Sequence, residues 1–262
     1  MEPGLPLVVR VAIFAVLGLV VGSFLTVVIH RVPRNESIVR PRSRCPRCGA
    51  ELRARDNLPV VGWLLLRGRC RACGERISPF YPLTELATGA LFAGAAFLDP
   101  LYAAAVASAF MASMVAVAVI DARHRIVPNR ITYTMTPTFA AAIIVGDLAG
   151  HGLSILDGLL GMVLYAVPLF LIALALPGGM GMGDVKLVAM IGLVLGAFGL
   201  RYVGVAAFLG IVGGGVGALL AMAVMGYGRK QQIPFGPFLA AGGALALLLG
   251  PPIADWYLGL LP

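Results

Sequence analysis

Long apolar blocks separated by short polar segments are the feature that most limits what this chain can fold into. A helix that crosses a bilayer needs about 20 mostly apolar residues, and several blocks meet that length. Only 12% of the residues are charged, against about 25% in soluble domains. The sequence therefore predicts an all-α, polytopic membrane protein. About eight transmembrane helices are expected, near residues 7–29, 83–98, 101–120, 131–147, 157–176, 186–200, 202–225 and 237–258.

The basic residues predict the orientation of these spans. Of the 20 Lys and Arg residues, twelve arginines lie in the segment 31–82, between the first two spans. Connections on the opposite side, such as 98–102 and 145–154, contain no Lys or Arg. Basic loops stay in the cytoplasm, so we expect the N-terminus outside and the segment 31–82 inside. Anionic lipid headgroups account for the net charge of +8, and no nucleic-acid partner is expected.

The four cysteines form two C-x₂-C pairs, CPRC at 45–48 and CRAC at 70–73. A reducing compartment disfavours disulfides, whereas two such hooks match a tetrahedral zinc site. Gly49 and Gly74 follow the hooks directly, and the tight turns of a zinc knuckle favour glycine. A small cytoplasmic domain with one structural Zn²⁺ is therefore expected between the first two spans; unrelated thiols or a redox pair are the alternative. The expected ligands are Cys45, Cys48, Cys70 and Cys73.

Two carboxylates stand out from the other acidic residues. Asp121 ends the third predicted span in AVAVIDARHRIVPNR, and Asp184 follows the fifth in GGMGMGDVKL. The predicted topology puts both at one membrane depth, on the cytoplasmic side. Two carboxylates held close together share one proton, and such a pair hydrolyses peptide bonds in aspartic proteases. Alternatively, Asp121 pairs with a nearby arginine, and Asp184 caps the next helix.

The residues around the two carboxylates have expected supporting roles. Gly181 and Gly183 would let the backbone approach an extended substrate and let Asp184 move into register. Pro128 and Asn129 would turn the chain away after the first motif. Lys186 is expected to be an interfacial anchor rather than a catalytic base.

At these residues the chain resembles the prepilin peptidase family, also called type IV leader peptidases, which are membrane aspartic proteases of the Gly-x-Gly-Asp type. The resemblance covers most of the chain and follows the order of the family's motifs. The matching segments are GSFLTVVIHRVPR at 22–34, the cysteine segment at 43–86, DARHRIVPN at 121–129, GMGDVKL at 181–187 and QIPFGPFLAAGG at 232–243.

The resemblance implies a specific activity. Members of the family remove the basic leader from type IV prepilins and pseudopilins after a glycine, at the cytoplasmic face of the bacterial inner membrane. Many then methylate the new amino terminus with S-adenosylmethionine. Asp121 and Asp184 match the catalytic aspartates. Gly68 and Arg69 match positions linked to methyl transfer, although a turn glycine beside a solvated arginine is an equal alternative.

Three parts of the chain are expected: a first transmembrane helix at 1–30, a cysteine domain at 31–82 and a transmembrane peptidase domain at 83–262. Two other functions compete with a bifunctional peptidase. A membrane-bound methyltransferase or zinc scaffold without peptidase activity would tolerate loss of both aspartates. An ion-coupled transporter would place carboxylates at mid-span and contain inverted repeats, and the sequence has neither feature.

Overall fold

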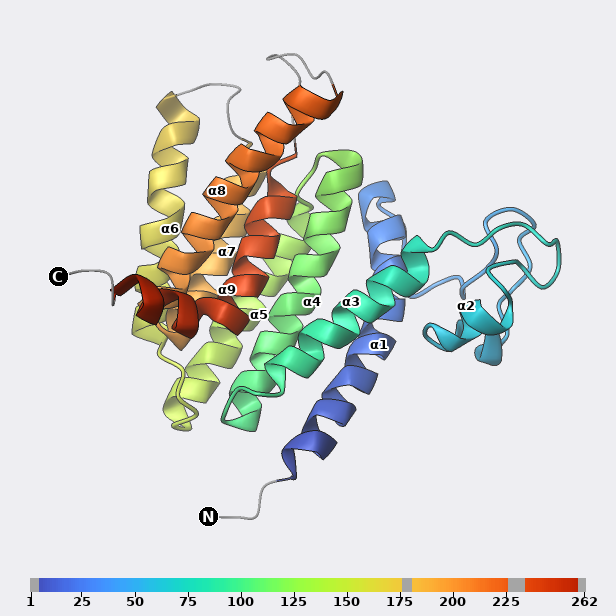
Figure 1. Ribbon diagram of the computed structural model, residues 1–262, viewed down its shortest axis with the longest axis horizontal. Helices are drawn as coiled ribbons and strands as arrows, with labels where there is room; N and C mark the ends of the chain where they lie inside the picture. The colour runs from blue at the N-terminus through green and yellow to red at the C-terminus, as the bar shows by residue number, and fades with distance from the viewer. Residues whose placement is uncertain (1–4, 176–180, 226–233, 259–262) are drawn as a thin grey trace. The chain divides into compact units, whose positions relative to one another are not determined.

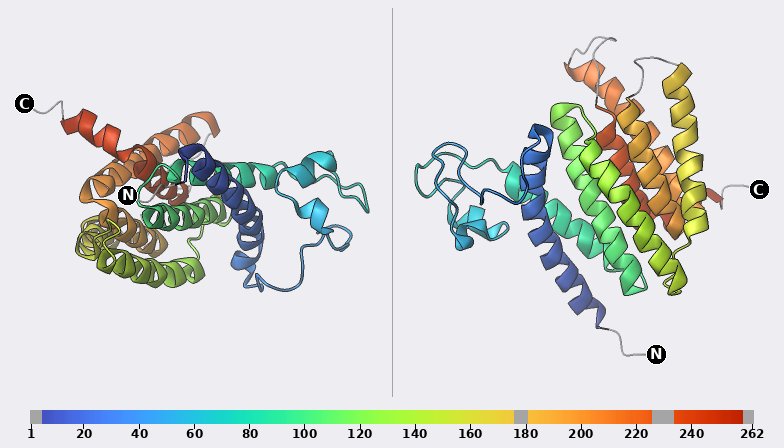
Figure 2. Two further views of the ribbon diagram at one scale, coloured as in Figure 1. Left: turned by 90° about the horizontal axis from the view of Figure 1, so that it is seen from below. Right: turned by 180° about the vertical axis from the view of Figure 1, so that it is seen from behind.

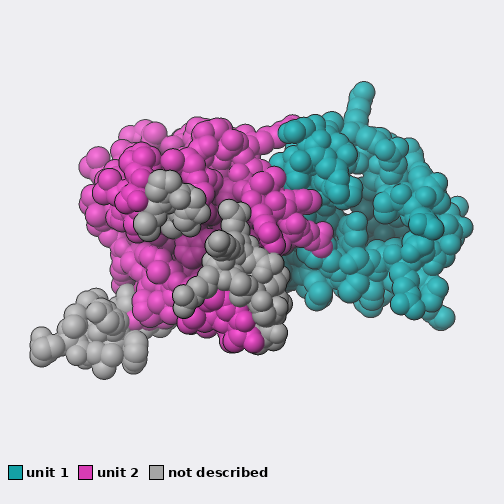
Figure 3. Space-filling view, turned by 90° about the horizontal axis from the view of Figure 1, so that it is seen from above, with its two compact units in different colours: residues 1–99 teal, residues 100–262 magenta. Residues whose placement is uncertain are grey.

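The computed structural model describes residues 5–175, 181–225 and 234–258, and its regular elements in these ranges are helices (Figure 1). The described residues contain two isolated β-bridges and no named strand. This confirms the all-α class predicted from the sequence. The chain divides into two compact units, residues 1–99 and 100–262 (Figure 3).

The first unit is built on two long helices joined by the cysteine-containing segment. Helix α1 packs against α3 at two glycines of α1. A Cβ atom at Gly18 would lie 2.7 Å from the carbonyl oxygen of Thr88, and one at Gly22 would lie 2.7 Å from Cα of Glu85. Because these two positions of α1 carry no side chain, the two backbones approach closely. The elements are α1 (Leu7–Arg31), η1 (Val32–Arg34), η2 (Ala54–Asn57), α2 (Val61–Leu65) and α3 (Phe80–Ala95).

The second unit is a helical bundle in which α7 is the most enclosed element (Figures 1 and 2). Helix α7 contacts α5, α6, α8 and α9, and α9 also contacts α4. Apolar side chains of α4 and α7 form much of the core of this unit. The helices are α4 (Leu101–His124), α5 (Asn129–Leu148), α6 (Ile155–Ala175), α7 (Met182–Phe198), α8 (Leu200–Met225) and α9 (Gly236–Leu258).

A helix lies at each of the eight predicted spans, but the described helices differ in length. By length and composition, five can cross a membrane: α1 with η1, α4, α5, α6 and α8. Helix α3 has 16 residues and α7 has 17, and the apolar stretch described in α9, Gly236–Gly250, is also short. A multi-pass helical architecture is therefore confirmed, while the number of eight transmembrane helices is not.

Glycines also bring α6 and α7 into backbone contact. A Cβ atom at Gly161 of α6 would lie 2.5 Å from the carbonyl oxygen of Gly192. In the other direction, a Cβ atom at Gly192 of α7 would lie 2.9 Å from the carbonyl carbon of Gly161. Both obstacles are backbone atoms, which cannot swing aside as a flexible side chain can. Small residues serve this purpose in membrane helices, where apolar lipid provides no hydrophobic drive for association.

This packing predicts that Gly192→Ala destabilises the protein. The added methyl group must separate α6 from α7, and overpacking of this kind costs about 1–3 kcal/mol. The matched control is Gly204→Ala in α8, where an added Cβ atom meets nothing within 4 Å. The free energy of unfolding of purified protein, measured by SDS titration of detergent micelles, should fall for Gly192→Ala alone. Equal stability of the two variants would contradict the described contact.

Candidate active site

Asp121 lies in the last turn of α4, and its side chain is buried. The helix ends at His124 because Arg125 adopts a left-handed conformation with φ of 55°, and the Arg125 N–H donates to the Asp121 carbonyl oxygen at 2.8 Å. Pro128 then immediately precedes α5, which begins at Asn129. Helix α4 thus holds the carboxyl group inside the bundle while the chain turns outward behind it.

Asp184 lies in the first turn of α7 and is half-buried. The N-cap position is occupied by Gly181, whose carbonyl oxygen accepts the N–H of Asp184 at 3.0 Å. A Cβ atom at Gly181 would lie 3.4 Å from Asp184 Oδ2. An acidic side chain in the first turn interacts favourably with the helix dipole. Two residues of the preceding glycine run, Gly178 and Gly179, lie outside the described residues.

The two motifs are joined by contacts between α7 and the segment that enters α5. The Lys186 ammonium donates to Asn129 Oδ1 at 3.0 Å and lies 4.8 Å from the centre of the Tyr133 ring. A Cβ atom at Gly183 would lie 3.0 Å from Cβ of Val127. Lys186 therefore links the second motif to the first, a role that the sequence analysis did not foresee. Through these contacts the segment between the end of α4 and the start of α5 meets the start of α7.

One residue at this site was missed by sequence reasoning. The backbone N–H of Gly236, the first residue of α9, donates to Asp121 Oδ2 at 3.0 Å. The available signal was the run Pro234-Phe235-Gly236-Pro237, which is typical of a tight entry into a helix. Nothing in that run identifies Asp121, 115 residues away, as the acceptor.

The four cysteines converge in the first unit as their spacing predicts. Their sulfur atoms all lie within 4.8 Å of one another, so the group can hold a metal ion. The two hooks have the same conformation: the N–H of Gly49 donates to the Cys45 carbonyl and that of Gly74 to the Cys70 carbonyl, each at 2.9 Å. Both glycines have φ above 70°, a conformation that suits glycine.

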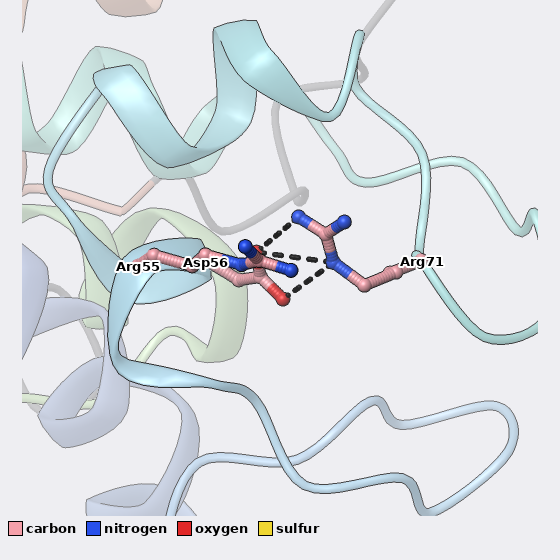
Figure 4. A network of polar contacts seen from close by, with 3 residues as sticks. All are labelled: Arg55, Asp56 and Arg71. Carbon is pink, nitrogen blue, oxygen red and sulfur yellow. Dashed lines mark hydrogen bonds and ion pairs between the residues drawn. The ribbon is translucent and has the colours of Figure 1, made fainter.

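An ion pair between Arg71 and Asp56 fixes the second hook (Figure 4). Arg71 lies between Cys70 and Cys73 in the sequence. Arg71 Nε donates to both carboxylate oxygens of Asp56, at 3.2 and 3.0 Å, and a terminal nitrogen donates to Oδ1 at 2.6 Å. These hydrogen bonds hold the pKa of Asp56 below its usual value and raise that of Arg71. Hydrogen bonds from the backbone of Cys73 and Ala72 lower the pKa of Cys70 to about 7, whereas desolvation and hydrogen bonds with the neighbouring thiols raise the pKa of Cys73 to about 12. Within this group of thiols the thiolate therefore forms first at Cys70.

Gly68 and Arg69 line a cavity of about 380 Å³ in the first unit. Its wall includes the Trp63 indole, whose N–H donates to the Ile77 carbonyl at 3.0 Å. A Cβ atom at Gly68, where φ is +65°, would lie 2.9 Å from Trp63 Cζ2. A side chain there would press on the indole, so glycine suits both the conformation and the space. Three arginines are among the residues that line the cavity, Arg67, Arg69 and Arg76.

Glu85 connects α3 to this part of the unit. Its side chain is buried and accepts the N–H of Val60 at 2.7 Å. Val60 has φ of 59°, which is strained for a β-branched residue. Because Val60 immediately precedes α2, Glu85 helps to fix the short helix that carries Trp63.

Comparison with known proteins identifies relatives of both parts of the chain. Residues 16–98 match the bacterial peptidase A24 N-terminal domain, and residues 108–219 match the type IV leader peptidase family. No solved structure matches the chain.

Full-length relatives carry the name prepilin leader peptidase/N-methyltransferase. The Bacillus subtilis protein is 36% identical, and the alignment covers 94% of this chain and 97% of that protein. The Burkholderia pseudomallei (strain 1026b) protein is 37% identical, and the alignment covers 95% of this chain and 88% of that protein. The Aeromonas salmonicida (strain A449) protein is 32% identical, with 93% and 92% covered. With matches along nearly the whole chain, this protein belongs to the type IV leader peptidase family.

Proposed function

We propose that this multi-pass membrane protein is an aspartic endopeptidase that uses Asp121 and Asp184 to remove leaders from type IV prepilins and pseudopilins. The observation that carries the proposal is that the helix ends bearing Asp121 and Asp184, 63 residues apart in sequence, meet through the segment between α4 and α5, where Lys186 donates to Asn129 and Gly183 packs against Val127. The placement of the two aspartates at helix ends argues against a mid-membrane ion relay. Gly181 and Gly183 support Asp184, while Pro128, Asn129 and Lys186 support the segment behind Asp121.

The chemistry needs one proton shared between the two carboxyl groups. The ionised carboxylate takes a proton from water, and the water oxygen attacks the carbonyl carbon of the scissile peptide. The protonated carboxyl group gives its proton to the carbonyl oxygen, which produces a gem-diol. The C–N bond then breaks as the first carboxyl group protonates the leaving nitrogen. One gem-diol proton returns to the second carboxylate, which restores the starting state.

The proposed orientation puts the N-terminus outside the bacterial inner membrane and the active site and cysteine domain in the cytoplasm. It rests on the twelve arginines of 31–82, because basic loops stay inside. A basic leader on the same side of the membrane would then meet the site directly, with the cut after a glycine. The proposed functional parts are a membrane helix at 1–30, a zinc-type domain at 31–82 and a peptidase domain at 83–262. The membrane helix and the peptidase domain would contact the lipid bilayer.

We expect Asp121→Asn and Asp184→Asn each to abolish leader cleavage. Loss of a general acid or base costs about 10²–10⁴-fold in rate, and each change removes one of the two groups. Detergent-purified protein and a type IV prepilin would be scored for leader release on a gel. Asp157→Asn is the matched control, because Asp157 is an exposed carboxylate of the same unit. Full cleavage by either active-site variant would remove that residue from the mechanism and favour a methyltransferase or scaffold without peptidase activity.

The cysteine cluster is proposed to bind one structural Zn²⁺. Four thiolates complete a tetrahedral zinc shell and leave no position for a reacting water, so the metal would fold the segment rather than take part in hydrolysis. The fit rests on the clustering of the sulfurs and on the matched geometry of the two hooks.

Purified protein should therefore contain about one zinc per chain by elemental mass spectrometry. Cys45→Ser should lose most of it, and its segment 31–82 should become sensitive to protease, because metal binding and folding are coupled in such sites. Ser43→Ala in the same segment should keep the metal. Zinc-free wild-type protein with a protease-resistant segment would rule out a structural metal.

We also propose that the cavity beside Gly68 and Arg69 binds S-adenosylmethionine for methylation of the new amino terminus. Guanidinium groups bind carboxylates well, so the arginines would hold the carboxylate of the cofactor. The Trp63 indole offers a face for its adenine ring. When bound, the cofactor supplies the methyl group.

Arg69→Ala should weaken binding of S-adenosylmethionine by about 10- to 150-fold, because a charge-assisted hydrogen bond contributes roughly 1.5–3 kcal/mol. Equilibrium dialysis with labelled cofactor measures this without relying on turnover. Leader cleavage should be unchanged. Arg42→Ala, an exposed arginine outside the cavity, is the control; equal binding by the two variants would place the cofactor elsewhere.

A further inference from the structure

We propose that Gly236 is a positioning residue of the peptidase: its backbone N–H holds the Asp121 carboxyl group, and its lack of a side chain leaves the space that this group needs. The inference rests on the proposed catalytic role of Asp121. It gives a function to the start of α9. The resemblance of the segment 232–243 to the family assigns no role to Gly236, and the matched family model ends at residue 219.

The hydrogen bond is buried and comes from the one suitable donor at the start of α9. The first N–H groups of a helix have no acceptor in the helix itself. Here Pro237 has no N–H, and the N–H groups of Phe238 and Leu239 donate to the carbonyl oxygen of Phe235. Among these first residues, Gly236 therefore provides the N–H that is directed out of the helix, and Asp121 Oδ2 accepts it at 3.0 Å.

The space around Gly236 also excludes a side chain at this position. A Cβ atom on Gly236 would lie 2.7 Å from Asp121 Oδ2, 3.0 Å from Cγ and 3.2 Å from Cβ. All three atoms belong to a buried side chain at the end of α4. Even alanine would have to push the carboxyl group away from its observed position.

Helix α9 is fixed against both helices that carry the aspartates. It contacts α4 and α7, and Gly243 lies at this junction. A Cβ atom there would lie 3.2 Å from Cγ2 of Ile191 in α7 and 3.3 Å from Cζ of Phe110 in α4. The N–H of Gly236 is thus held at a set place relative to both carboxyl groups.

This contact also acts on the charge of Asp121. An N–H group at a helix N-terminus interacts more strongly with a carboxylate than with a neutral carboxylic acid, so the start of α9 stabilises the ionised form of Asp121. Asp184 lies in the first turn of α7, so each of the two carboxyl groups lies at a helix N-terminus that favours its ionised form.

The test compares Gly236→Ala with Gly215→Ala, a glycine of α8 at which an added Cβ atom meets nothing within 4 Å. Misplacement of a catalytic group by about 1 Å costs roughly 10²-fold. We expect kcat for leader cleavage to fall by about that factor in Gly236→Ala, with KM unchanged. Thermal stability in detergent and methyl transfer to an already cleaved pilin should stay at wild-type levels, and Gly215→Ala should behave as wild type throughout.

Two results would overturn the inference. One is a kcat for Gly236→Ala equal to that of Gly215→Ala. The other is a loss of cleavage that comes with an equal loss of stability and methyl transfer, which would make Gly236 a folding residue only. Failure of the wild-type protein to cleave the prepilin would instead reject the proposed peptidase function, so the two failures are distinguishable.

Discussion

A carboxyl group buried in an apolar helical bundle is the interaction around which the second unit is arranged. Burial of an ionisable group is costly unless other groups compensate it. Asp121 meets this constraint at the end of α4 with a hydrogen bond from the start of α9, and Asp184 lies in the first turn of α7, which packs against the same helix. Three helix ends must therefore converge, and the packing of α9 against both α4 and α7 keeps them together. The fold of this unit serves to hold polar groups at a defined place in an apolar environment.

Glycine has three uses in this chain, and all of them depend on the absence of a Cβ atom. Between α1 and α3, and between α6 and α7, it allows backbones to touch where lipid provides no drive for helix association. At Gly236 the same property makes room for a carboxyl group rather than for a helix. The first unit uses glycine differently again, since Gly49 and Gly74 provide left-handed turns that bring the cysteine sulfurs together.

Hydropathy alone located the long helices, because each apolar block of sufficient length became one. Local chemistry also predicted the cysteine cluster and its turn glycines, since C-x₂-C spacing and the following glycine determine the turn. Long-range contacts could not be predicted in this way. The pairs Gly236–Asp121, Lys186–Asn129 and Arg71–Asp56 join residues whose separation in sequence carries no periodic signal. The start of α7 was not located correctly either: the helix begins at Met182 rather than at 186, so Asp184 lies inside its first turn.

The central claim is that Asp121 and Asp184 act together on one peptide bond. An experimental structure of the protein with a non-cleavable prepilin leader peptide bound tests it most directly, through the distances from the two carboxyl groups to the scissile peptide. The account predicts that both groups lie within hydrogen-bond reach, about 3 Å, of that peptide bond or of one water beside it. A peptide bound with only one of the two carboxyl groups near it, and packed side chains keeping the other away, would contradict the account.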